Sequence, residues 1–434
     1  MNKLPLLSRR ALIGSAALLG AGAMLPTRAF GATSAAAVFE SSWPKVTGLV
    51  SRYVTERKVP GMIAALGWGD GPLGAIARGI EGFDDSDPVS PDSLFRLYSM
   101  TKPITGMAAM LLIDEGKLGL DQPVADFVPE LAQMRVALDL AKGLESRPAR
   151  AQITIRHLLT HTSGLGYAGM SRDKASLELL RTGVVPAVVS RYSIPQFTPP
   201  VPTPGPEEFL RRTARVPLLF EPGTRWSYSM AYDVLGIVIE RASKARNFAA
   251  FLQERIFDPA GMKDSFFQLP PSLERKLTTN YGVLEGIAIP IDRPQSSAYF
   301  DPPPFAYGGA GLVSTPADYD RFLGLLVNRG KVGRRQVISE RALAMGLSNL
   351  LPSGASIRGT AIEGAGFGAG GRVGLGADEG SFGWSGAAGT VGFINRRIGL
   401  RAGLYVQYMP FTVYPVQQEF IAAARDDVLG RLSR

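Results

Sequence analysis

The chain has 434 residues, of which 45% are hydrophobic and 20% are charged, with a formal net charge of +9 and no cysteine. This balance is typical of a globular protein and excludes a disordered chain. The missing cysteines exclude disulfides, thiol nucleophiles and thiolate metal sites, and a modest charge without a long basic block gives no indication of nucleic-acid binding.

Residues 1–31 have the pattern of a signal peptide. Basic residues precede an uncharged run from Ala11 to Leu25, and Ala29-Phe30-Gly31 offers small residues at the two positions that a signal peptidase reads. The run is too short and too rich in Gly and Ala to span a bilayer, so we expect no stable membrane insertion. Because "SRRALIG", Ser8 to Gly14, resembles a twin-arginine signal, we expect export to the periplasm or beyond. Removing the four basic residues of this segment lowers the net charge from +9 to +5.

The first part of the mature chain predicts a helix, a hairpin and a second helix. Residues 42–57 have apolar side chains at helical spacing. Residues 61–79 predict two strands around the Asp70-Gly71-Pro72 turn. A second helix is predicted from Ser99 to Glu115, in which Pro103 is tolerated because it lies in the first turn.

The middle of the chain, roughly 115–290, has mainly helical patterns, and the last third returns to strand patterns. Six prolines between 194 and 207 predict a stiff extended segment, more typical of a loop or lid than of a linker between domains. Residues 389–396 and 400–409 predict adjacent antiparallel strands. Strand patterns at both ends of the mature chain indicate one sheet built from both, with a helical lobe inserted between them.

Three S-x-x-K sequences occur, at Ser42–Lys45, Ser99–Lys102 and Ser171–Lys174. About one such match is expected by chance for this composition, so the motif alone identifies nothing. Ser42 lies where the cap of a helix belongs. Ser171 lies among charges before another helix, so both of these matches are interpreted as helix caps.

The two histidines of the chain, His157 and His161, lie four residues apart, which places both rings on one helix face. No glutamate lies between them and no cysteine is available, so hydrogen-bonded structural roles are favoured over zinc binding. The nearest match to G-x-S-x-G is Gly383–Ala387, which fails at its last position. Both histidines also precede Ser385, whereas an α/β-hydrolase needs its histidine after the serine. A nucleophilic serine would therefore need another activating group, and lysine is the obvious substitute.

Ser99 is the serine whose surroundings best fit that chemistry. Helical spacing brings it within reach of Lys102, and the flanking residues are mostly apolar, which favours the neutral amine that a base requires. The start of the helix also favours a developing oxyanion. Tyr228 is the best candidate for a third group that relays the proton, although a tyrosine in such a loop is more often a packed surface aromatic.

With these residues in hand, the sequence resembles the serine β-lactamase and penicillin-binding-protein superfamily, in the branch of class C β-lactamases and family VIII carboxylesterases. Five segments match in order over nearly the whole mature chain: the nucleophile helix in 93–131, "ITIRHLLTHTSGL" in 153–165, the tyrosine motif in 221–236, "GGAGLVSTPADYDRFL" in 308–323 and "FGWSGAAGT" in 382–390. The resemblance implies an α/β (α+β) fold, with a central mainly antiparallel sheet flanked by helices and an inserted all-helical lobe. One domain over 40–434 would take its sheet from about 40–110 and 295–434 and its lobe from about 115–290.

The resemblance also implies roles for individual residues. Ser99 would be the acylated nucleophile, and Lys102 with Tyr228 would move its proton. The backbone N–H groups of Ser99 and Ala387 would form the oxyanion hole. Gly386 would keep the strand edge open for substrate, next to Ser385 among the substrate-binding residues. No cofactor and no metal are implied.

Two departures from the family pattern bear on the substrate. Met230 stands where many lactamases have an asparagine, and Trp384 stands where lactamases and peptidases have a lysine or histidine that holds a substrate carboxylate. We therefore expect a small-molecule ester substrate. The alternatives are a β-lactamase or DD-peptidase, an acyltransferase with the same three catalytic residues, and a penicillin-recognising module without turnover. The oligomeric state is left open.

Overall fold

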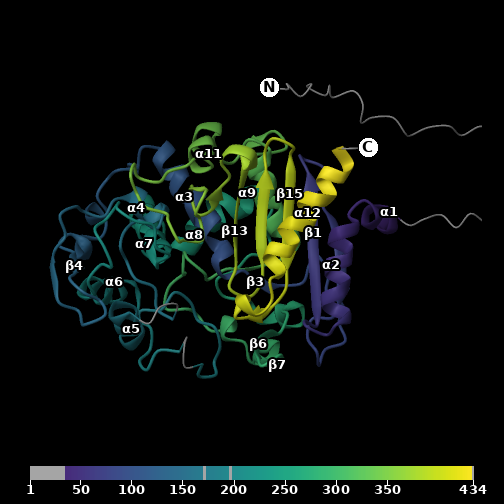
Figure 1. Ribbon diagram of the computed structural model, residues 1–434, viewed down its shortest axis with the longest axis horizontal. Coiled ribbons are helices and arrows are strands. Elements are labelled where there is room, and N and C mark those ends of the chain that lie inside the picture. The colour runs from purple at the N-terminus through teal and green to yellow at the C-terminus, as the bar shows by residue number, and fades with distance from the viewer. Residues whose placement is uncertain (1–34, 170–172, 195–197, 433–434) are drawn as a thin grey trace, which may run out of the picture.

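The computed structural model describes residues 35–169, 173–194 and 198–432. The predicted signal peptide lies outside the described residues. A central sheet stands between two layers of helices, and a helical lobe lies to one side of it (Figure 1).

Seven strands in the order β11-β12-β13-β14-β15-β1-β2 form the central sheet, and every neighbouring pair is antiparallel. The strands are β1 (Gly61–Trp68), β2 (Gly74–Gly79), β11 (Gly366–Phe367), β12 (Arg372–Val373), β13 (Ser381–Ser385), β14 (Val391–Asn395) and β15 (Leu400–Tyr405). β1 pairs with β2 and with β15, so strands from the two ends of the chain lie side by side in the sheet. This confirms the mainly antiparallel sheet and the predicted hairpin at 61–79.

Two helices from opposite ends of the chain cover one face of the sheet (Figure 1). They are α2 (Pro44–Thr55) and α12 (Val416–Leu432), and the short α1 (Ala35–Ser41) precedes them. Their apolar side chains, among them Val50 and Phe420, form one core cluster with the sheet residues of that face. The helical spacing of apolar residues in 42–57 therefore reflects the face of α2 that packs against the sheet.

The other face carries α3 (Thr101–Asp114) and α10 (Pro316–Val327), and α11 (Glu340–Gly346) packs against α3. All residues of α3 from Thr101 to Ile113 are buried, because this helix runs between the sheet and the lobe and its sequence is apolar on every side. Small residues permit the close packing. A Cβ on Gly106 would lie 2.2 Å from the carbonyl oxygen of Ala369.

The lobe contains short helices: α4 (Ile155–Leu159), α5 (Lys174–Arg181), α6 (Pro206–Arg215), α7 (Ala231–Ser243), α8 (Phe248–Leu252) and α9 (Asp258–Ala260). It also contains the antiparallel pair β4 (Arg135–Ala137) and β5 (Ser146–Pro148), so the lobe is not all-helical as the resemblance implied. These strands have three residues each, too few for a period-2 pattern to be recognised in the sequence.

Small sheets lie outside the central sheet. β6 (Asn280–Leu284) and β7 (Ile287–Asp292) form a hairpin, to which β16 (Tyr408–Met409) adds a parallel strand. β3 (Phe95–Arg96) pairs with β8 (Val313–Ser314), and β9 (Lys331–Val332) pairs with β10 (Arg335–Gln336).

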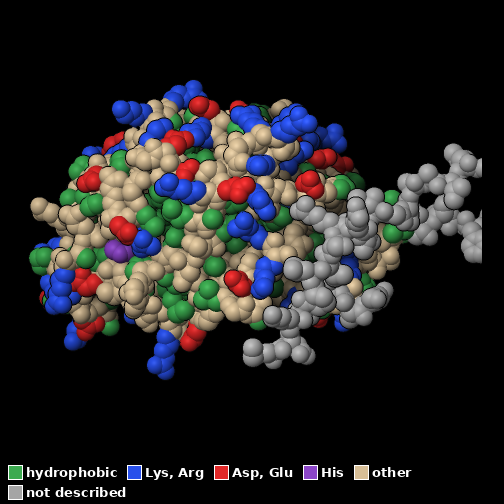
Figure 2. Space-filling model, turned by 90° about the horizontal axis from the view of Figure 1, so that it is seen from above, with side chains coloured by type: hydrophobic (Ala, Val, Ile, Leu, Met, Phe, Trp, Pro, Cys, Tyr) green, Lys and Arg blue, Asp and Glu red, His purple; other side chains and the backbone are tan. Residues whose placement is uncertain are grey.

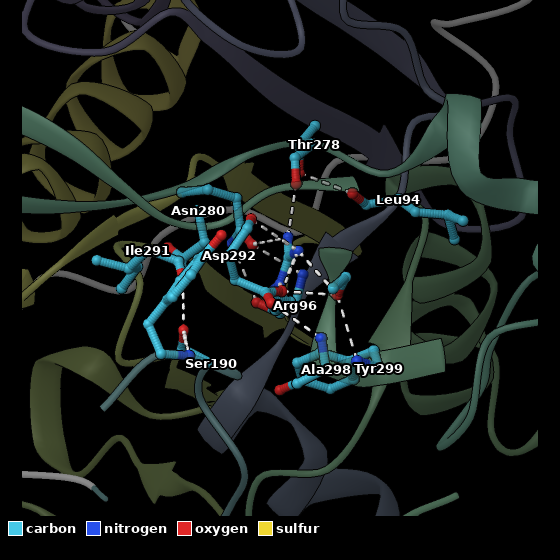
Figure 3. Close-up of polar contacts among 12 residues, drawn as sticks. Leu94, Arg96, Ser190, Thr278, Asn280, Ile291, Asp292, Ala298 and Tyr299 are labelled. Atoms are coloured by element: carbon cyan, nitrogen blue, oxygen red, sulfur yellow. Dashed lines mark hydrogen bonds and ion pairs between the residues drawn. The ribbon is translucent and has the colours of Figure 1, made fainter. Parts of the chain in front are cut away.

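A buried ion pair fixes β3 against β7 (Figure 3). Arg96 and Asp292 are both fully buried, and the Arg96 Nε donates to the Asp292 carboxylate at 2.7 Å. The Arg96 Nη1 donates to the carbonyl of Thr278 at 2.6 Å, and the Ser297 hydroxyl donates to Asp292 at 2.7 Å. Because both charges have several hydrogen bonds, their burial is compensated. Arg96 lies three residues before Ser99, so this network anchors the segment that leads to it.

On the face shown in Figure 2, basic and acidic side chains are interspersed. Within the described residues, no helix has the length and apolar character needed to cross a membrane.

Candidate active site

Ser99 lies in a tight turn between the end of β3 and the start of α3. Residues Tyr98–Met100 form one turn of 3-10 helix, and the α-helix begins at Thr101, slightly later than predicted. Tyr98 has φ +46°, a left-handed conformation that side chains other than glycine rarely adopt. Its hydroxyl accepts a hydrogen bond from Asn280 Nδ2 at 3.0 Å. The surrounding structure thus maintains a strained residue directly before the candidate nucleophile.

The structure brings Ser99, Lys102 and Tyr228 together. Lys102 Nζ donates to Ser99 Oγ at 3.2 Å, and the Tyr228 hydroxyl donates to Ser99 Oγ at 2.7 Å. Lys102 Nζ also lies 4.6 Å from the centre of the Tyr228 ring. Lys102 is fully buried and Ser99 is 8% exposed, so the serine oxygen is the member of the pair that reaches solvent. This arrangement can take a proton from Ser99 and return it to a leaving group.

A buried carboxylate behind Lys102 was not found by sequence reasoning. Lys102 Nζ donates to the carbonyl of Gly309 at 2.7 Å. The N–H of Gly309 in turn donates to Asp233 Oδ1 at 2.9 Å. Asp233 is fully buried in α7. Burial raises the pKa of its carboxyl to about 7, while the charge of Lys102 opposes the shift. The sequence signal was an isolated acidic residue within the apolar helix 231–239.

We expect the Asp233→Asn variant to lose the part of the pH dependence of the free energy of unfolding that comes from this carboxyl. The carboxyl pKa is raised in the folded state, so between about pH 4 and pH 7 the folded chain keeps a proton that the unfolded chain releases. The free energy of unfolding of the wild type therefore falls as pH rises, by about 2 kcal/mol between pH 5 and pH 7 from this group. Urea unfolding at the two pH values checks this. An equal change with pH in both proteins would contradict the prediction.

Aromatic rings surround the Tyr228 phenol. The Trp384 indole Nε1 donates to the Tyr228 oxygen at 3.3 Å, and the two rings stack with centroids 5.8 Å apart. The rings of His161 and Tyr167 lie 4.6 Å and 5.2 Å from that of Tyr228. Trp384 was predicted only as an apolar replacement for a cation. In the structure it also holds the phenol in place, through this hydrogen bond and the stacking of the two rings.

The histidines have structural hydrogen bonds. His157 Nδ1 accepts from the N–H of Thr154 at 3.1 Å as part of a capping box at the start of α4. His161 Nδ1 accepts from the N–H of Ser229 at 3.2 Å, next to Tyr228. Burial lowers the pKa of both rings, that of His161 well below its usual value. Within the described residues, no group of three or more potential metal-ligating side chains is found.

The backbone of Ser99 and that of the segment after β13 lie close together. A Cβ on Gly386 would lie 2.4 Å from the carbonyl oxygen of Leu97, so the glycine permits this close approach. The Gly386 N–H donates to the carbonyl of Thr390 at 2.8 Å. Packing thus accounts for this glycine, and its role toward substrate stays a prediction. The oxyanion hole formed by the N–H groups of Ser99 and Ala387 likewise stays a prediction.

Of the remaining predicted substrate-binding residues, two lie beside the Ser99 turn and one is buried in the core. Trp384 and Ser385 are half-buried on β13, at the end of the strand that lies beside the Ser99 turn. Met230 is fully buried, and its sulfur lies 4.0 Å from the Thr213 hydroxyl oxygen. Its side chain contributes to the core of the lobe rather than to an accessible surface.

Comparisons with known proteins find similarity over most of the chain. The sequence matches the Beta-lactamase family model over residues 46–425. An uncharacterized protein from Mycobacterium tuberculosis is 37% identical over 268 residues, and the match covers 62% of each chain. Esterase EstB from Burkholderia gladioli is 30% identical over 383 residues, covering 82% of this chain and 88% of that protein.

An acyltransferase and a solved structure extend the comparison. Acyltransferase calJ from Penicillium decumbens is 30% identical over 362 residues, covering 76% of this chain and 81% of its own. The structure of EstCE1, described as a hydrolase with promiscuous acyltransferase activity, superposes with a TM-score of 0.72 at 24% identity. The superposition covers 90% of this chain and 99% of that chain. It confirms the predicted fold.

Proposed function

The chain belongs to the Beta-lactamase family, and from this we propose that it is a serine hydrolase that cleaves carboxylic esters through an acyl-enzyme on Ser99. The observation that carries the proposal is the position of Ser99 Oγ, which lies in hydrogen-bonding contact with both Lys102 Nζ and the Tyr228 hydroxyl. The predicted export of the chain belongs to the same proposal.

In the proposed acylation, Ser99 Oγ attacks the ester carbonyl carbon while its proton passes to the Lys102–Tyr228 pair. The carbonyl oxygen takes the negative charge and binds the N–H groups of Ser99 and Ala387. Collapse of this intermediate breaks the bond to the alcohol oxygen, which receives the proton from Tyr228 and leaves as the alcohol. Water then repeats the sequence on the acyl-enzyme, releasing the acid and restoring the Ser99 hydroxyl.

Trp384 supports an ester over a β-lactam as substrate. A β-lactam or a peptide with a free carboxylate needs a cation at this position, whereas the chain presents an indole whose N–H is already bonded to Tyr228. The aromatic groups of Trp226, Phe367 and Trp384 make this side of the site apolar. Transfer of the acyl group to an alcohol rather than to water is the second candidate function, because one relative is named an acyltransferase.

A substrate panel tests the proposed function. We expect p-nitrophenyl butyrate to be hydrolysed with a kcat/KM at least about 100-fold above those of butyryl p-nitroanilide and nitrocefin, with a burst of p-nitrophenol. Mass spectrometry after treatment with a fluorophosphonate should locate the adduct on the peptide that contains Ser99.

The other readings give different results in the same panel. Comparable turnover of nitrocefin would indicate a β-lactamase. Diversion of the acyl group to an added alcohol, without faster release of acid, would indicate an acyltransferase. The absence of both turnover and adduct would indicate a binding module and contradict the proposal.

A further inference from the structure

The hairpin of β6 and β7 has an apolar outer face. Leu284 and Ile287 are paired across the hairpin and are each 66% exposed, and Ile289, two residues further along β7, is 48% exposed. The opposite face packs inward through Tyr281 and Val283. An antiparallel pair with one solvated face normally carries polar residues there. Adjacent exposed aliphatic side chains therefore indicate a binding surface rather than ordinary packing.

The same face continues toward the candidate active site. A bulge at Ile291 interrupts the alternation of side chains along β7. Ile291 still lies on this face, because its Cγ2 lies 3.0 Å from where a Cβ on Gly282, the residue paired with Ile289, would stand. Ile291 is half-buried and packs against a cluster that includes Tyr98 and Ala388. Ala387, the candidate oxyanion donor, packs against this cluster as well. The apolar strip of Leu284, Ile287, Ile289 and Ile291 thus runs from an exposed tip to the neighbours of Ser99.

Hydrogen bonds and an ion pair hold the inner end of the strip in place (Figure 3). The Ser190 hydroxyl donates to the carbonyl of Ile291, and the next residue, Asp292, forms the buried ion pair with Arg96. Arg96 lies three residues before Ser99. A chain lying on the strip would therefore meet a rigid surface at a fixed position relative to the serine, which lowers the entropy cost of binding.

We propose that the apolar strip binds the aliphatic chain of long-chain ester substrates, so that it determines chain-length specificity. This inference rests on the proposed function. The proposal is supported because the strip is continuous with the apolar surroundings of Ser99 and Ala387. None of its four residues is charged. From Ile287 to Ile291 it spans about 13 Å, long enough for an extended acyl or alkyl chain. Each methylene that it buries favours binding by about fourfold.

The test compares p-nitrophenyl butyrate with p-nitrophenyl decanoate, both below their aggregation concentrations. We expect the double variant Ile287→Thr/Ile289→Thr to lower kcat/KM for the decanoate about tenfold through a higher KM, and to change the butyrate value less than twofold. Threonine keeps the β-branched shape that suits a strand. Ile398→Thr is the matched control, since Ile398 is 41% exposed and lies in the turn at the opposite end of β14 from Val391.

Each other outcome overturns the inference. Equal losses for both esters would show a general defect. An unchanged decanoate KM, with self-association that the double variant abolishes, would assign the strip to a second copy of the chain. Rates that rise only above the aggregation concentration would assign it to a lipid surface. If the wild type cleaves neither ester, the proposed function itself fails, whereas cleavage of butyrate without an effect of the strip refutes only this inference.

Discussion

Replacing Ser99 by alanine is expected to lower kcat/KM for p-nitrophenyl butyrate by about 10⁴-fold or more. The hydroxyl is the atom that both Lys102 and Tyr228 contact, and its removal leaves no nucleophile between them. Steady-state kinetics measures the loss, and the burst of p-nitrophenol and the fluorophosphonate adduct should disappear with it. Retention of full activity would contradict both the assignment of the nucleophile and the proposed function.

A matched control for this substitution lies in the same chain. Ser42 begins another S-x-x-K sequence, and its hydroxyl donates to the carbonyl of Phe39 at 2.7 Å in the segment before α2. Ser42→Ala removes an equivalent hydroxyl far from the site, so activity should remain within twofold of the wild type. Thermal unfolding of both variants shows whether any loss of activity comes from loss of folded protein.

The double variant Ser99→Ala/Lys102→Met tests whether the two residues act as a unit. When the nucleophile is absent, the group that moves its proton has no further role, so the second substitution should add little to the loss. A loss equal to the product of the two single effects would instead indicate that Lys102 acts independently of Ser99, for example through the stability of its buried environment.

The sequence predicted the chemical groups of the site better than their arrangement. Ser99 and Lys102 are three residues apart, so local geometry alone brings them together. Tyr228 was only a candidate until the family pattern supported it, because nothing local connects it with a serine 129 residues away. The hydrogen bond from Trp384 to Tyr228 and the contact of Asp233 with Gly309 depend on tertiary packing, and no periodicity indicates them.

For the fold, too, local patterns were predictable from the sequence, whereas features that depend on tertiary packing were not. The strands β1, β2, β14 and β15 have five or more residues, and their patterns were readable in the sequence. β11 and β12 have two residues each and lie in the glycine-rich segment 364–374, where no alternation can be seen. The left-handed conformation of Tyr98 was also unpredictable, because an aromatic residue adopts it only when the surrounding structure imposes it.

Replacing Tyr228 by phenylalanine is expected to lower kcat/KM by about 10² to 10⁴-fold. Phenylalanine keeps the ring that stacks on Trp384 and packs against His161, so the change is confined to the hydroxyl. What is lost is the 2.7 Å contact with Ser99 Oγ, the shortest path for its proton. Trp384→Phe is the matched control, because it removes the weaker 3.3 Å donor to the same oxygen, keeps an aromatic ring beside Tyr228 and should cost less.

The choice of leaving group separates a role in proton transfer from a role in packing. p-Nitrophenolate leaves without protonation, whereas an alkoxide needs a proton as its bond to carbon breaks. If Tyr228 supplies that proton, Tyr228→Phe should reduce the hydrolysis of ethyl butyrate at least about tenfold more than that of p-nitrophenyl butyrate. Equal losses on the two esters would show that the phenol acts before the leaving group departs, either by activating Ser99 or by shaping the site. The fluorophosphonate reaction then distinguishes these two, because it needs an activated Ser99 but no protonation of an alkoxide leaving group.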